Sequence, residues 1–193
     1  MKSLSPGIVL LALLLASACS TREPTAPIPP APRFTTSQYI QDRQRVAAPF
    51  AHVVFCKDYA AECAKASGPA AVKLTASAME ELQTVNGDVN AQIVAQDDTE
   101  NDTWTLFPRF GDCDDFAVSK RHELIARGWP APALRLAIGV TPENEGHMVL
   151  VARTSRGDLV LDNRDDRVKP WQDADLTWRS IQSLDDPHVW HRI

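Results

Sequence analysis

The sequence predicts an α+β fold in which N-terminal helices pack on a C-terminal antiparallel sheet. Apolar side chains recur at helical spacing in residues 75–93 and again in residues 116–125. Strand-like runs joined by short connections follow from residue 134 to the C-terminus. Helices followed by strands are typical of an α+β domain with a largely antiparallel sheet.

The elements have recognisable ends. Thr75 is placed to cap the first helix, and Cys113 lies in the first turn of the second, which stops at Gly128 and Pro130. The expected strands cover residues 134–140, 148–153, 158–161, 177–182 and 189–193.

The 193 residues fit one globular domain, residues 34–193, preceded by a leader. The formal net charge is -5 and there is no basic run. A nucleic-acid partner needs a basic face, so this class of function is excluded.

Residues 1–18 predict an export signal, because one Lys and a short apolar stretch precede small residues. Two interpretations of the processing site stay open. Residues 16–18 fit an ordinary A-x-A cleavage site, whereas residues 15–19 fit a bacterial lipobox in which Cys19 carries the lipid. Residues 19–33 are rich in Pro and predict an extended tether. We therefore expect a periplasmic domain that contacts a membrane only through the anchor at Cys19, with Ser20 compatible with the outer membrane.

The remaining cysteines fall into two groups. Cys56 and Cys63 lie close together in FCKDYAAEC, and an oxidising compartment favours a local disulfide between them. A zinc site is the alternative, although the spacing is atypical for paired zinc ligands. Cys113 is left as a lone thiol.

Cys113 is the candidate nucleophile, because a helix N-terminus stabilises a thiolate. His122 lies nine residues further along the same helix and faces away from it. His147 enters a strand after a turn and is the candidate base.

Asp162 is the candidate third member of a catalytic triad. If Ser155 and Arg156 form a two-residue hairpin loop, Val149 faces Asp162. His147 and Asp162 then share a face as diagonal neighbours, about 7 Å apart at Cβ. A carboxylate at that position can orient the imidazole.

Three acids, Asp112, Asp114 and Asp115, surround Cys113 and would raise the pKa of its thiol. Asp is favoured at helix starts, where backbone N–H groups offset its charge. The alternative is a bound Ca²⁺, which prefers clustered carboxylate oxygens.

The segments GDCDDFAVSKRHELIARGWP and EGHMVLVARTSRGDLVLDN, with FAHVVFCKDYAAEC, VNGDVN and DDPHVW, make residues 48–193 similar to the bacterial transglutaminase-like cysteine proteinases of the LapG type. The resemblance implies a papain/transglutaminase-like fold, with Cys113 as nucleophile, His147 as base and Asp162 as third member. It also implies calcium dependence through the acids that flank the cysteine. A protein substrate such as a cell-surface adhesin, and an inner-membrane regulatory protein as partner, are further implications.

Three functions stay open. The first is a cysteine endopeptidase, in which water resolves the thioester formed at Cys113. The second is an acyltransferase of the transglutaminase type, in which an amine takes the acyl group. The third is a catalytically inactive binding module on the same fold.

Overall fold

The computed structural model describes residues 38–98 and 102–193. The expected export signal, Cys19 and the tether lie outside the described residues. In the part of the chain that the structure describes, no helix is long and apolar enough to cross a membrane.

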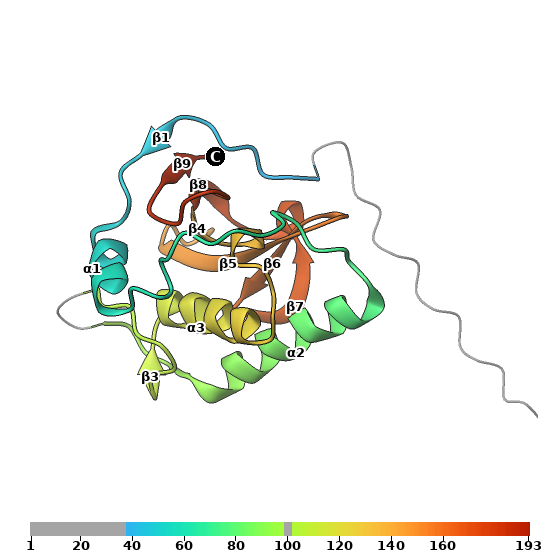
Figure 1. The fold of residues 1–193 in the computed structure, drawn as a ribbon. Coiled ribbons are helices and arrows are strands. Elements are labelled where there is room, and N and C mark those ends of the chain that lie inside the picture. Colours follow the sequence, from blue (N-terminus) through green and yellow to red (C-terminus); the bar gives the residue numbers. More distant parts are fainter. Residues whose placement is uncertain (1–37, 99–101) are drawn as a thin grey trace, which may run out of the picture. The chain divides into compact units, whose positions relative to one another are not determined.

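A seven-stranded antiparallel sheet forms the centre of the domain (Figure 1), and the antiparallel arrangement is the one that the sequence predicts. Its order is β1-β9-β8-β4-β5-β6-β7, and each strand runs antiparallel to its neighbours. The strands are β1 (Arg45–Val46), β4 (Leu134–Val140), β5 (Gly146–Thr154), β6 (Gly157–Asp162), β7 (Asp165–Pro170), β8 (Thr177–Gln182) and β9 (Trp190–Arg192). The two edge strands β1 and β7 are not expected from the sequence.

Three helices pack with the sheet: α1 (Phe50–Asp58), α2 (Ala76–Gln92) and α3 (Cys113–Ala126). In Figure 1, α2 and α3 lie next to each other on one side of the sheet. The main core fills this space with buried side chains from both layers, among them Leu82, Val85, Phe116, Leu124, Leu136, Leu150 and Leu161. Burial of this apolar surface is what holds the helices on the sheet.

The opposite face of the sheet has a smaller core. Val149, Val151 and Val160 alternate with the residues that face the helices. Ile40 from the N-terminal segment and Ala174 from the connection before β8 are buried against them. Both faces of the central strands are therefore buried.

Local chemistry explains where α2 and α3 begin and end. The Thr75 hydroxyl accepts a hydrogen bond from the backbone N–H of Ala78 at 3.1 Å, which caps α2 as expected. Beyond α3, Gly128 adopts a φ of 93°, a left-handed conformation that favours glycine.

The hairpin formed by β5 and β6 has the expected register. Thr154 pairs with Gly157 across the two-residue turn, and Leu150 pairs with Leu161. Gly157 has a φ of 118°, and a Cβ there would lie 2.7 Å from the carbonyl oxygen of Gln38. Both the turn and the close approach of the N-terminal segment therefore require glycine at this position.

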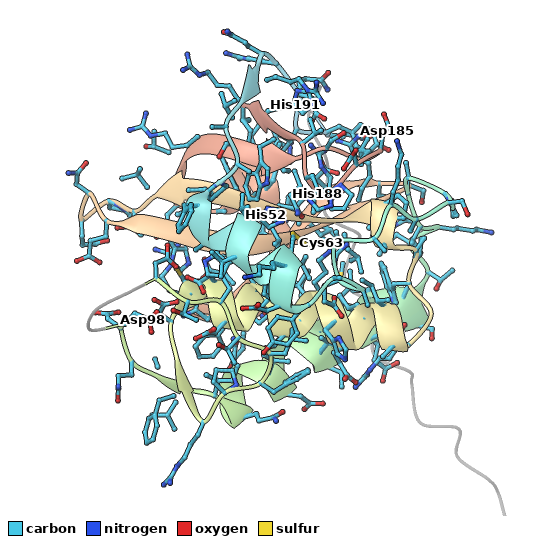
Figure 2. All side chains as sticks on the ribbon, turned by 60° about the vertical axis from the view of Figure 1, so that its left-hand side comes forward. His52, Cys63, Asp98, Asp185, His188 and His191 are labelled. Atoms are coloured by element: carbon cyan, nitrogen blue, oxygen red, sulfur yellow. A yellow bond between two sulfur atoms is a disulfide. The ribbon has the colours of Figure 1, made fainter. Side chains whose placement is uncertain are left out.

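Cys56 and Cys63 form the expected disulfide, which ties α1 to the turn that follows it. His52, one helical turn before Cys56, lies against this bond, with Nε2 3.3 Å from the sulfur of Cys56. Figure 2 shows His52 and Cys63 close together, with His188 beside them. The Gln182 side chain donates to His52 Nε2 at 3.0 Å, and burial is the main cause that lowers the pKa of His52 to about 4. His52 is therefore a neutral residue of the packed interior.

Candidate active site

Cys113 is the first residue of α3, at the helix N-terminus. Asp112 precedes it as the N-cap, and Asp112 and Asp115 form a capping box. The Asp115 carboxylate accepts hydrogen bonds from the backbone N–H groups of Thr105 at 2.6 Å and Asp112 at 3.2 Å. These bonds fix the direction in which the chain enters the helix, and with it the position of the cysteine.

The glycine of the Gly111-Asp112-Cys113 motif has a steric role. Gly111 ends β3 (Phe110–Gly111), which pairs with β2 (Val94–Ala95) in a small parallel sheet beside α3. A Cβ at residue 111 would collide with the carboxylate of Asp115 and would lie 2.9 Å from a ring carbon of Pro108. A side chain there would push the capping carboxylate out of place.

His147 and Asp162 are joined by a direct hydrogen bond. His147 Nε2 donates to Asp162 Oδ1 at 2.8 Å, and Asp162 is only 1% exposed. Burial opposes ionisation of Asp162, but hydrogen bonds from His147 and Arg164 outweigh it and hold the pKa of this carboxyl well below its usual range. The imidazole is thus held by a buried carboxylate, with Nδ1 left to accept a proton.

The sulfur of Cys113 lies next to the strand that carries His147. The backbone N–H of Met148, the residue after His147, donates a hydrogen bond to this sulfur. Burial raises the pKa of the Cys113 thiol to about 12, and Asp114 and Asp112 add to the rise. The thiol therefore needs a base before it can act as a nucleophile.

Cys113 and His147 line one open cleft of about 610 Å³. Its lining includes residues 95–98, from the end of β2 and the segment after it, and Asp102. It also includes residues 145–147, where β5 begins, and residues 163–164 after β6. Five acidic side chains and one arginine line the cleft: Asp97, Asp98, Asp102, Asp112, Glu145 and Arg164.

Three carboxyl groups, Asp102, Asp112 and Asp114, gather beside the cysteine. Asp114 is 6% exposed, and its Oδ1 has no hydrogen-bond partner among residues 38–98 and 102–193. Burial and the neighbouring acids raise its pKa to about 10, and burial is also the main cause of the raised pKa of Asp102. A cluster of this kind is unfavourable unless a proton or a cation offsets its charge.

Asp115, predicted as a calcium ligand, caps α3 in the structure, and its role toward calcium stays a prediction. Its carboxylate accepts hydrogen bonds from the backbone N–H groups of Thr105 and Asp112, and burial raises its pKa to about 6. Asp102 lies beside Asp114, and its Oδ1 accepts a hydrogen bond from Trp104 Nε1 at 2.9 Å. The acidity of residues 95–103 was the available signal, but the sequence does not show that this loop reaches α3.

A known protein family matches most of the sequence. The family model described as bacterial transglutaminase-like cysteine proteinase (BTLCP) matches residues 42–193. The chain belongs to this family. The description of the family states that its members are cysteine proteinases. No curated protein matches the sequence.

Solved structures of a family relative are similar to this chain. Calcium-bound LapG of Legionella pneumophila is 25% identical, with a TM-score of 0.52 over 58% of this chain and 67% of that chain. LapG and EGTA-treated LapG of the same organism are each 26% identical, with TM-scores of 0.51 over 58% of this chain and 66% of theirs. The α+β fold of this chain is therefore that of the cysteine proteinase family.

We predict that Gly111→Ala lowers the free energy of unfolding by about 1–3 kcal/mol, because the new methyl group displaces the capping carboxylate of Asp115. Gly87→Ala in α2 is the matched control, since a Cβ there has no neighbour within 4 Å. This control should stabilise the protein by about 0.5–1 kcal/mol. Denaturant unfolding of both variants measures the difference, and equal stabilities would contradict the steric role of Gly111.

Proposed function

We propose that this protein is a cysteine endopeptidase that cleaves an exported protein substrate. The observation that carries the proposal is the cleft that contains both a cysteine at a helix N-terminus and an imidazole bonded to a buried carboxylate. A nucleophile, a base and an orienting acid are the parts that covalent acyl transfer needs. The open cleft suits an extended stretch of polypeptide.

His147 and Cys113 each have a defined role in the proposed reaction. His147 Nδ1 takes the proton of the Cys113 thiol, and the sulfur attacks the carbonyl carbon of the scissile peptide bond. The positive end of the α3 helix dipole, where Cys113 lies, stabilises the negative charge that develops on the carbonyl oxygen. The imidazolium then gives its proton to the leaving amine, which leaves a thioester on Cys113. Water, deprotonated by His147, hydrolyses this thioester and restores the thiol.

The resemblance to LapG-type proteinases supports a cell-surface adhesin as the substrate. An inner-membrane regulatory protein stays a prediction from the same resemblance. The Legionella structures support a different part of the proposal, which is a calcium site, because one of these LapG structures is calcium-bound.

Cleavage of candidate surface proteins by residues 34–193 tests the proposal. We expect Cys113→Ala to abolish cleavage and Asp162→Asn to lower kcat by about four orders of magnitude, because the amide no longer holds the catalytic tautomer. His122→Ala is the matched control, since His122 lies on the same helix but contacts Glu62. Cleavage by the Cys113→Ala variant would overturn the proposal.

The same preparation separates hydrolysis from acyl transfer. Iodoacetamide should modify one sulfur in the folded domain, because Cys56 and Cys63 are paired and Cys113 is free. A substrate fragment that gains an added primary amine, in place of a free carboxylate, would identify the protein as an acyltransferase. A Cys113 that iodoacetamide does not modify would favour a binding module.

Calcium is the cation that fits the acidic cluster. Asp112 and Asp114 place carboxylate oxygens within 4.8 Å of each other, and the side chain of Asp102 is hydrogen-bonded to Asp114. Carboxylate oxygens are the hard ligands that calcium prefers, and among the described residues the buried Oδ1 of Asp114 has no hydrogen-bond partner. When bound, the ion would offset the negative charge beside the cysteine. We therefore assign the third ligand position to Asp102 in place of Asp115.

Thermal unfolding tests this ligand set without any measurement of activity. Calcium at about one hundred times its dissociation constant should raise the melting temperature of the wild type by about 5–10 °C relative to EGTA. Asp102→Asn and Asp114→Asn should lose most of this rise. Asp115→Asn should unfold at a lower temperature but keep the rise. Loss of the calcium effect in Asp115→Asn alone would contradict the assignment.

The N-terminal leader supports export and a lipid anchor at Cys19. Cells that express the full chain with a radioactive fatty acid should label the wild-type protein and leave Cys19→Ser unlabelled. Both variants should be exported, because the apolar segment of residues 8–15 is unchanged. An unlabelled wild-type protein would indicate cleavage at the A-x-A site and a protein without an anchor.

A further inference from the structure

Arg164 holds both partners of the hydrogen bond between His147 and Asp162. We propose that Arg164 is a positioning residue that fixes the plane of the Asp162 carboxylate and, through it, the imidazole of His147. The inference rests on the proposed function, because it gives Arg164 a part in the chemistry of Cys113. The sequence does not predict this role.

The first observation is that Arg164 occupies one side of the Asp162 carboxylate. Arg164 Nη2 donates to Asp162 Oδ2 at 2.9 Å, and its Nε lies 3.3 Å from the same oxygen. The backbone N–H of Arg164 donates to Oδ1 at 2.9 Å. With Oδ2 occupied by the guanidinium, the carboxylate cannot rotate, and Oδ1 is the oxygen that faces His147 Nε2.

The second observation is that Arg164 is itself held at its outer end. Its Nη2 also donates to Asp175 Oδ1 at 2.8 Å. Asp175 lies between η2 (Trp171–Asp173) and β8, and its side chain is 60% exposed. A chain of contacts thus runs from this surface acid through Arg164 and Asp162 to His147. A guanidinium tied at two sites loses little further entropy when it orients the carboxylate.

The third observation is the contact between Arg164 and the imidazole. Arg164 Nε lies 3.2 Å from His147 Nε2. Arg164 Nε also lies 3.4 Å from Asp162 Oδ1, so the guanidinium contacts the imidazole and the carboxylate at the point where the two meet. These contacts with both partners restrict how the ring can move relative to the carboxylate.

Charge alone does not explain the need for arginine here. Lys120 on α3 is 1% exposed and interacts electrostatically with Asp162, but burial lowers the pKa of Lys120 to about 7. What Arg164 adds is the planar geometry of two adjacent N–H donors, which lysine lacks. The Arg164→Lys variant should therefore be impaired almost as strongly as Arg164→Ala.

The chain also contains a matched control. Arg167 contacts Asp165 with the same pattern, through Nε, Nη2 and the backbone N–H. Its side chain is 82% exposed, and neither residue lines the cleft. Arg167→Ala removes an arginine–aspartate pair of the same spacing without touching His147.

The test measures the rate at which iodoacetamide alkylates Cys113 in the full folded domain, in calcium-containing buffer. Arg164→Ala and Arg164→Lys should each react about 10- to 100-fold more slowly than the wild type, the effect of one or two lost charge-assisted hydrogen bonds. Arg167→Ala should react at the wild-type rate. Free guanidinium, at a concentration that does not unfold the protein, should restore the rate of Arg164→Ala, whereas methylammonium should not.

Cleavage kinetics provide the second measurement. If Arg164 positions the triad, kcat falls in Arg164→Ala and KM changes little. A wild-type alkylation rate in Arg164→Ala would overturn the proposal, and a rise in KM alone would identify Arg164 as a substrate contact. Slow alkylation that guanidinium does not restore would also overturn it, because a distorted fold would then explain the loss. Alkylation does not need a protein substrate, so the role of Arg164 can hold even if the endopeptidase proposal fails.

Discussion

The hydrogen bond between His147 and Asp162 depends on the register of one hairpin. A turn of two residues joins β5 to β6, and Thr154 pairs with Gly157 across it. Because side chains alternate along a strand, a turn with one more residue would put the imidazole and the carboxylate on opposite faces. Gly157, which has a left-handed backbone and touches Gln38, holds the turn at this length. Chemistry at the cleft thus rests on backbone geometry at the far end of the hairpin.

The start of α3 combines stability and reactivity in five consecutive residues. Gly111 leaves space for the Asp115 carboxylate, and Asp112 and Asp115 cap the helix. Asp114 adds a buried oxygen that has no hydrogen-bond partner in the part of the chain that the structure describes. The caps bring negative charge close to Cys113, where it opposes formation of a thiolate. A cation beside the sulfur would relieve this conflict, and LapG of Legionella pneumophila, which has a similar fold, has been solved in a calcium-bound form. The acids that cap the helix and the thiol of Cys113 thus have opposing electrostatic requirements at the start of α3.

A second buried cluster links α1 to the wall of the cleft. His52 lies against the Cys56–Cys63 disulfide, and its ring centroid is 5.5 Å from that of Trp104. Trp104 in turn donates to Asp102, the acid that completes the cluster beside α3. A packed aromatic thus fixes one of the carboxyl groups at the cleft, so the interior under α1 contributes to the geometry of the site.

The sequence by itself indicated α2, α3 and the strands β4, β5, β6, β8 and β9, because periodicity and caps are local properties of the chain. It favoured the Cys56–Cys63 disulfide over a zinc site, and it predicted the hairpin register for a loop of two residues. The tertiary structure alone decided that Asp102 joins the acidic cluster while Asp115 caps the helix, and that Arg164 lies between Asp162 and Asp175. These contacts depend on loops that converge from distant segments, and no local pattern specifies where such a loop ends. The tertiary structure also decided the pairing of β1 with β9 at the edge of the sheet, because a strand of two residues shows too little periodicity to be predicted.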